Sequence, residues 1–337
     1  DNADIPNEST SNLYRGEVQL HSNITNYLVL TGGVEGTLSE VQSSLFGNPD
    51  AYSIGAYVVG DITFNFPLIA SIGVRYDYSK LDSLDGSGAV SPKLGLNYKI
   101  SKELILRSSF GTGFRAPTTA EAFTSTSTGG ITVKPNPNIK SEYNLTFEFG
   151  ANYTPMKFIN FDFAVFQNEY YDMIEPGVDP ADGLVFFSNL VRARIQGLEA
   201  STIFYLLPNE LSLSFNYTYL WARDLETGTA LRYRPRHIFY SGVDFRKWNF
   251  DFGINFRYTS RVEEIDDELV DLGIVVDGDV RVPVYTTDVK LGYTLVSFNL
   301  PLNIYLNIKN IFNYNYVELI GNLRQIRNYS FGINLML

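Results

Sequence analysis

Polar and apolar residues alternate with a period of two over most of this chain. In 143–153, YNLTFEFGANY, Phe147 and Phe149 occupy odd positions, while Glu148 and other polar or small residues occupy even positions. Successive side chains of a β-strand point to opposite faces of its sheet, so the pattern predicts strands with one apolar and one wet face. We expect lipid-facing positions at Phe147, Phe149, Phe250, Phe252, Ile304 and Leu306, and wet ones at Glu148, Asp251 and Asn303.

The alternation predicts fifteen strands, joined by connections that are short and long in turn. The predicted strands are 13–21, 27–41, 51–64, 67–79, 89–99, 103–112, 141–153, 157–173, 191–206, 210–223, 235–246, 248–262, 283–295, 301–311 and 327–337. The long connections are 42–50, 80–88, 113–140, 174–190, 224–234, 263–282 and 312–326. Short turns at one end and long loops at the other are typical of antiparallel outer-membrane barrels, whose loops are extracellular.

Composition separates a membrane barrel from other fold classes. Aromatic residues make up 15% of the chain and charged residues only 19%, and the mean hydropathy is −0.06. No apolar run approaches the roughly 18–20 residues that a transmembrane helix needs. A soluble all-β binding protein also alternates, but its strands average about five or six residues and do not end in aromatic girdles. The net charge of −11 argues against nucleic acid as a partner.

One predicted strand changes phase. Arg192 and Arg194 are even-numbered, whereas the polar residue Glu199 is odd-numbered, and Gly197 lies between them. A β-bulge at this glycine would place all three charged residues in the lumen. The alternative is a regular strand in which Glu199 faces outward near its end.

Five segments resemble the TonB-dependent outer-membrane receptors. They are FGTGFRAPTTAEAF at 110–123, NPNIKSEYNLTFEFG at 136–150, ARIQGLEAS at 193–201, YRPRH at 233–237 and NIKNIFNYNYVE at 307–318. They occur in the family's order, although Ser141 stands where the family commonly has proline. Residues 1–109 fit by strand pattern alone.

The resemblance implies an all-β, antiparallel transmembrane β-barrel. The whole chain, 1–337, would be a partial barrel domain that supplies about fifteen of 22 strands, with the plug domain outside it. Two motifs would lie at the extracellular rim, Phe114, Arg115, Ala116 and Pro117 in the first and Asn136, Pro137 and Asn138 in the second. They either shape the rim or contact ligand.

The same resemblance implies a bacterial outer-membrane receptor rather than an enzyme. It would contact outer-membrane lipid, be driven by TonB through the plug, and take up a scarce nutrient such as a ferric siderophore or cobalamin. Residues that would face the lumen or plug are Glu148, Arg192, Arg194, Glu199, Asp251 and Arg257. Tyr233, Arg234 and Arg236 are candidate contacts to an anionic ligand. A passive porin of about 14–16 strands is the alternative.

The sequence contains no recognisable catalytic set and suggests no cofactor. His21 and His237 stand far apart in sequence, and the chain lacks cysteine, so a metal site built from them is not indicated. No histidine falls in 118–135, which disfavours haem through the ligand that haem receptors of the family carry there. The acidic run 263–271 is either a calcium ligand set or a solvated loop.

Overall fold

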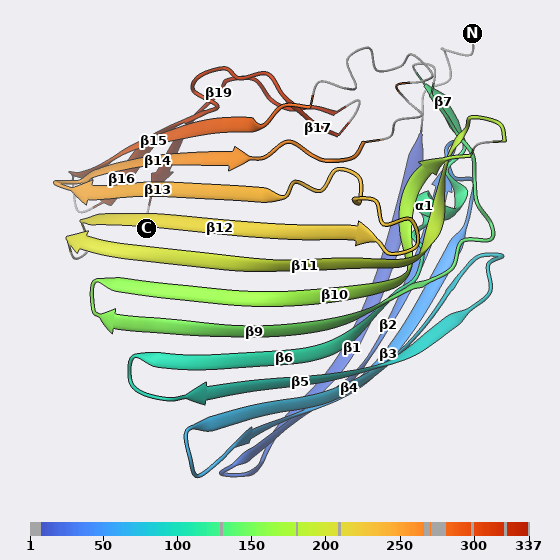
Figure 1. Cartoon of the computed structure of the whole chain (residues 1–337), viewed down its shortest axis with the longest axis horizontal. Helices are drawn as coiled ribbons and strands as arrows, with labels where there is room; N and C mark the ends of the chain where they lie inside the picture. The colour runs from blue at the N-terminus through green and yellow to red at the C-terminus, as the bar shows by residue number, and fades with distance from the viewer. Residues whose placement is uncertain are drawn as a thin grey trace.

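The computed structural model describes residues 8–128, 131–179, 181–207, 210–265, 270, 281–297, 300–319 and 322–335. Most of them belong to one curved antiparallel sheet (Figure 1). Its long strands are β1 (Ser9–Thr25), β2 (Leu28–Ser43), β3 (Asp50–Thr63), β4 (Leu68–Leu81), β5 (Ser87–Lys99), β6 (Leu104–Arg115), β9 (Glu142–Met156), β10 (Ile159–Val178), β11 (Val185–Leu207), β12 (Leu211–Asp224), β13 (His237–Lys247), β14 (Phe250–Thr259), β15 (Val284–Ser297), β16 (Leu300–Lys309) and β19 (Asn328–Leu335).

All fifteen predicted strands are confirmed, whereas the small elements inside the loops were missed. These are α1 (Thr119–Phe123), β7 (Thr126–Thr128), β8 (Ile131–Val133), β17 (Val317–Leu319) and β18 (Asn322–Leu323). Such pieces are too short to carry a readable period. The described residues contain no helix long and apolar enough to span a membrane.

Each long strand pairs with the next long strand along the chain. β6 pairs with β9 across the segment that holds α1, β7 and β8, and β16 pairs with β19 across β17 and β18. Among the described residues, β1 pairs only with β2 and β19 only with β16, and no register joins β1 to β19. The sheet is therefore open, as expected for part of a larger barrel.

The strand registers divide the side chains between two faces. Directly opposite residues on paired strands share a face. Phe149 lies opposite Val165, and Glu148 lies opposite Phe166, so the two residues belong to different faces. We call the face that carries Glu148 the inner face, because the two clefts described below lie on it, and the opposite one the outer face. The predicted face assignment is confirmed at every one of the nine positions given above.

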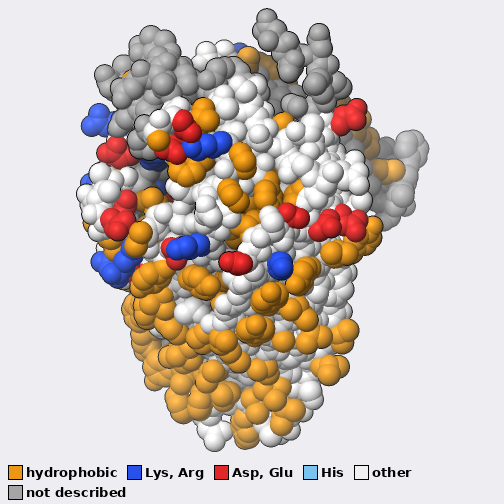
Figure 2. All heavy atoms as spheres, turned by 90° about the vertical axis from the view of Figure 1, so that its right-hand side faces the viewer, with side chains coloured by type: hydrophobic (Ala, Val, Ile, Leu, Met, Phe, Trp, Pro, Cys, Tyr) orange, Lys and Arg blue, Asp and Glu red, His pale blue; other side chains and the backbone are white. Residues whose placement is uncertain are grey.

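The outer face is apolar over much of its height. Phe149 is 51% exposed and Phe250 is 57% exposed, values that a water-soluble sheet rarely shows for phenylalanine in a regular strand. Figure 2 shows the right-hand side of Figure 1, with hydrophobic side chains gathered in its lower half and charged side chains above them. Such a zone matches the apolar band of a transmembrane barrel.

The bulge predicted at Gly197 is wrong. β11 keeps a single register against β10 from Arg192 to Phe204, and against β12 from Ala193 to Tyr205. Glu199 therefore lies on the inner face as predicted, but Arg192 and Arg194 lie on the outer face. They avoid contact with the apolar band because β10 and β11, with 20 and 23 residues, continue beyond it.

The neighbouring strand β10 carries polar residues beside the two arginines on the outer face. Glu169 of β10 lies opposite Arg194, and Gln167 lies opposite Gln196, so the outer face turns polar on both strands together. The phase change thus marks the upper limit of the apolar zone on this face. It does not mark a β-bulge or other break in the pairing of β11 with its neighbours.

Candidate functional site

The first motif ends β6 and anchors the rim. Arg115, the last residue of the strand, donates through Nε to Glu142 Oε1 of β9 at 2.8 Å and through Nη1 to Glu121 Oε2 of α1 at 2.8 Å. A planar guanidinium can hold two carboxylates at once in fixed directions. Arg115 therefore ties the loop helix to the sheet.

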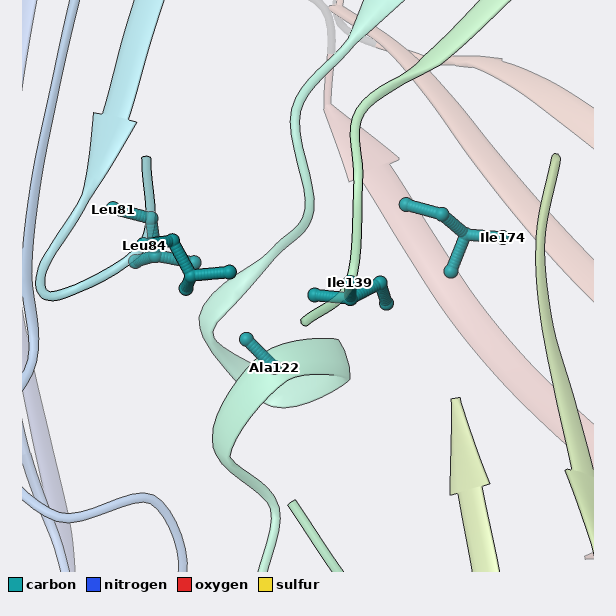
Figure 3. Close-up of a cluster of buried hydrophobic side chains, with 5 residues drawn as sticks. All are labelled: Leu81, Leu84, Ala122, Ile139 and Ile174. Carbon is teal, nitrogen blue, oxygen red and sulfur yellow. The ribbon is translucent and has the colours of Figure 1, made fainter. Parts of the chain in front are cut away.

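The helix is short but fully capped. Thr118 accepts a hydrogen bond from the Glu121 backbone N–H, and the Glu121 side chain accepts one from the Thr118 backbone N–H, which is a capping box. Ala122 of α1 is completely buried in an apolar cluster with Leu81, Leu84, Ile139 and Ile174 (Figure 3). The cluster joins the end of β4, two loops and β10 at the loop end of the sheet.

The second motif meets the first at this cluster. Asn136 donates from its backbone N–H to Ala122 O at 3.0 Å and from Nδ2 to Phe187 O of β11 at 2.7 Å. Its Oδ1 accepts from the backbone N–H of Asn138 at 3.0 Å, and Pro137 and Asn138 are exposed. The structure thus brings both rim motifs together, and the contacts of Arg115 and Asn136 are structural.

The remaining residues of the first motif take different positions. Phe114 belongs to the outer face, where its ring lies 5.5 Å from that of Tyr143. Ala116 and Pro117 follow the end of β6, as expected for a proline that cannot extend the ladder.

The candidate ligand contacts lie in the segment between β12 and β13. Tyr233 has a positive φ of 56° and donates its backbone N–H to Glu264 O at 3.0 Å. Arg234 Nη2 donates to Glu175 Oε1 at 2.9 Å, and Arg236 Nε donates to Glu263 Oε1 at 2.6 Å. Both guanidinium groups therefore already hold a carboxylate.

The inner face of β1 to β5 carries an ion-pair chain beside a cleft of about 590 Å³. Arg15 Nη2 donates to Glu35 Oε2 at 2.8 Å, Arg75 Nη2 donates to Glu35 Oε1 at 2.9 Å, and Arg75 Nε donates to Asp77 Oδ1 at 2.7 Å. Lys93 also lines the cleft and is exposed. Cations and anions alternate across the strands, so each charged group of this chain of ion pairs has a partner of opposite charge.

A second inner-face cluster lies on β6, β9 and β10. Arg107 donates to both oxygens of Asp162, at 2.7 and 2.8 Å, and to Glu148 at 3.2 Å. Farther along, Lys290 donates to Asp251 at 3.1 Å. Glu199 is exposed on the same face, and within the described part of the chain it has no hydrogen-bond or ion-pair partner.

The second cleft, of about 510 Å³, lies under the segment that holds β17 and β18. Arg257 Nη2 donates to Glu318 Oε1 of β17 at 2.7 Å, and Arg324 Nε donates to Glu318 Oε2 at 2.6 Å. Burial alone would raise the pKa of Glu318, but the two guanidinium groups outweigh it and the pKa is lowered. Arg257 therefore lies on the inner face, held by a loop residue that the sequence did not indicate.

The comparison with family models decides what this sheet is. Residues 6–311 match the model described as "TonB dependent receptor-like, beta-barrel". The chain belongs to this family. Its resemblance to these receptors is thereby confirmed over most of its length, including residues 6–109, where the sequence offered only a strand pattern.

Solved structures of receptor barrels share the fold. The FrpB iron transporter from Neisseria meningitidis is 15% identical with a TM-score of 0.73, covering 97% of this chain and 55% of that one. The siderophore receptor PirA from Acinetobacter baumannii is 18% identical with a TM-score of 0.72, covering 97% and 55%. The copper transporter OprC is 15% identical with a TM-score of 0.76, covering 97% and 56%. The chain thus spans about half the length of the structures it matches.

Among the described residues, no three His, Cys, Asp or Glu side chains converge as metal ligands. The two histidines have other partners, Thr31 Oγ1 for His21 at 2.9 Å and the Tyr217 hydroxyl for His237 at 2.8 Å. Most of the acidic run 263–271, the calcium candidate, lies outside the described residues.

Proposed function

We propose that this chain is the barrel part of an outer-membrane receptor that takes up a scarce nutrient, such as a ferric siderophore, with energy delivered by TonB. The observation that carries the proposal is the family match over residues 6–311. The similar structures include an iron transporter and a siderophore receptor, which favours iron complexes as cargo.

The outer face supports the proposed placement in a membrane. Its exposed Phe149 and Phe250 would contact acyl chains, because burying apolar surface in lipid removes it from water. A charged side chain at mid-depth would cost roughly 2–4 kcal/mol for arginine, and the face carries its charges above the apolar zone instead.

The inner face is suited to a docked domain. Glu148, Asp251 and Arg257 already hold ion-pair partners in the chain, whereas exposed Glu199 and Lys93 would take a basic and an acidic group of a plug. In this proposal the plug and further strands are supplied from outside this chain, which spans about half the length of the similar structures. Work done on the plug by TonB would open the path, so the barrel itself needs no catalytic residue.

Ligand contact is assigned to the loop end, at Tyr233, Arg234 and Arg236. An anionic ferric complex would compete with Glu175 and Glu263 for the two guanidinium groups. Charge-assisted hydrogen bonds of this kind contribute about 1.5–3 kcal/mol each, and about 1.4 kcal/mol is a tenfold change in affinity.

The test is uptake of a radiolabelled ferric siderophore panel by cells that produce the whole receptor. We expect uptake of at least one complex that disappears when TonB is absent, and at least about tenfold weaker binding by Arg234→Gln/Arg236→Gln. Arg246→Gln, a 66% exposed arginine on β13 away from this segment, is the matched control. Uptake that is unsaturable and independent of TonB would overturn the proposal in favour of a passive porin.

A further inference from the structure

The outer face carries an arginine-rich site above its apolar zone, built on β10, β11 and β12. Glu169 is only 4% exposed, and it accepts from Arg194 Nε and, at 3.2 Å, from Arg192 Nη2. The side chain of Arg192 remains 44% exposed. One nearly buried carboxylate therefore holds two guanidinium groups, of which one is open to the outside.

A third arginine adds to the charge. Arg223 of β12 lies directly opposite Arg194, an arrangement that is unfavourable for like charges. Arg223 Nη2 donates to Glu263 Oε2 at 2.9 Å, and the same carboxylate also holds Arg236. Four arginines thus share two carboxylates, in a chain whose net charge is −11. Within the described residues, positive charge is therefore in local surplus at this site, and an anion from outside the chain would balance it.

The position of these arginines on the outer face indicates which class of anion would bind them. The guanidinium of Arg192 lies 5.5 Å from the ring centre of Tyr171, and that of Arg223 lies 5.4 Å from that of Trp221. Tyrosine and tryptophan prefer the level of lipid headgroups. On the same face of β10, Val165 and Phe163 are exposed apolar residues below this level.

We propose that Arg192, Arg194 and Arg223, the outer arginine cluster, bind a phosphate group of a membrane-lipid headgroup. Guanidinium groups bind phosphate through paired N–H donors, and Glu169 holds two of them in place. The inference uses only the membrane placement of the proposed function. It depends neither on TonB nor on the nutrient.

The test is lipid binding by the detergent-purified receptor, measured by native mass spectrometry. The probes are a diphosphorylated glucosamine lipid and its dephosphorylated form, each alone and with inorganic phosphate in excess. We expect the phosphorylated lipid to bind at least about tenfold more tightly, and Arg192→Gln/Arg194→Gln to remove that preference. Lys93→Gln, which removes one positive charge from the inner face, leaves the preference intact.

The double variant leaves Glu169 without cations, so it can fail to fold. Arg192→Gln/Arg194→Gln/Glu169→Gln removes the whole ion cluster and keeps hydrogen-bonding side chains of similar size. The proposal predicts loss of the phosphate preference in this variant with unchanged insertion into lipid. Equal binding of the two lipid forms by the unaltered receptor would overturn it, as would complete displacement of the lipid by inorganic phosphate, which indicates a site for the free ion. A receptor that fails to enter membranes contradicts the proposed function instead.

Discussion

Two ion clusters on the same strand, β10, face opposite sides of the sheet. Asp162 and Glu169 are seven residues apart, an odd number, so their side chains point in opposite directions. On the inner face, one arginine, Arg107, holds two carboxylates. On the outer face, one carboxylate, Glu169, holds two arginines.

The two clusters differ in how much each depends on a single carboxylate. Asp162 is 34% exposed and has Asn152 as a further donor, so the inner cluster tolerates the loss of one member. Glu169 is 4% exposed and is the only carboxylate that pairs with Arg192 and Arg194 among the described residues. The outer cluster therefore depends on a single group, and the inner one does not.

The largest expected effect is that of Glu169→Ala. It leaves two neighbouring guanidinium groups without their carboxylate, which costs about 3 kcal/mol, the lower end for breaking a buried pair because Arg192 is partly exposed. Asp162→Ala is the matched change on the inner face and should cost about 1 kcal/mol, since Glu148 still holds Arg107. Urea unfolding in lipid vesicles measures both, and equal losses would show that the two faces do not differ as described.

Two glycines on the inner face, Gly150 and Gly197, differ in what a side chain there would meet. A Cβ at Gly197 would meet the backbone oxygen of Tyr219 at 2.5 Å and the ring of Phe166 at 2.6 Å, whereas one at Gly150 would meet only the side chain of Arg107, at 2.7 Å. A backbone atom cannot turn aside, so Gly197→Val should cost about 2 kcal/mol and Gly150→Ala less than about 1 kcal/mol.

Folding yield into vesicles and unfolding midpoints check this order. We therefore expect Gly197 to resist substitution because of a steric clash, and not because it forms a β-bulge. A variant Gly197→Val as stable as Gly150→Ala would mean that β11 and β12 are farther apart than the register implies.

The rim junction should give a smaller effect. Arg115→Lys keeps the charge but cannot hold Glu121 and Glu142 with a planar fork, so we expect a loss of about 1 kcal/mol, confined to α1 and its surroundings. The rate of amide hydrogen exchange should rise at α1 and stay unchanged in β10 away from Ile174, which lies in the same buried cluster as Ala122. Faster exchange throughout the sheet would instead assign Arg115 a role in the global fold.

The smallest effect is expected from a change of pH, which acts on the loop contacts of Lys134. Lys134 Nζ donates to Asp179 and Asp182, each at 2.6 Å, and these contacts lower the pKa of both carboxyl groups. A depressed carboxyl pKa stabilises the loop above the usual value of about 4 and loses this contribution as pH falls through the lowered pKa. Exchange of the neighbouring amides should therefore rise only at acid pH, and Lys134→Gln should abolish that dependence.

The sequence predicts most of the sheet because alternation is local. Each of the fifteen long strands could be identified from its own residues, and so could the face of Glu148 or Phe149. The faces of Arg192 and Arg194 could not, because they depend on where the apolar zone ends. That limit is set by Gln167 and Glu169 on the neighbouring strand.

The contacts at the rim could not be predicted from local sequence patterns either. Sequence motifs indicated Arg115 and Asn136, but their joint attachment to α1 depends on a helix of five residues inside a loop. The partner of Arg257, Glu318, comes from a loop 61 positions away in the chain. Long-range contacts of this kind have no spacing that a single sequence displays.

The most direct test is the environment of two adjacent positions, Leu198 and Glu199. The chain contains no cysteine, so single cysteines at these positions can carry a nitroxide spin label in the reconstituted receptor. An unbroken β11 predicts that the label at 198 collides mainly with oxygen dissolved in lipid, and the label at 199 mainly with a water-soluble nickel complex. Labels that report the same environment, or the reverse order, would contradict the division of the sheet into a polar inner face and an apolar outer face.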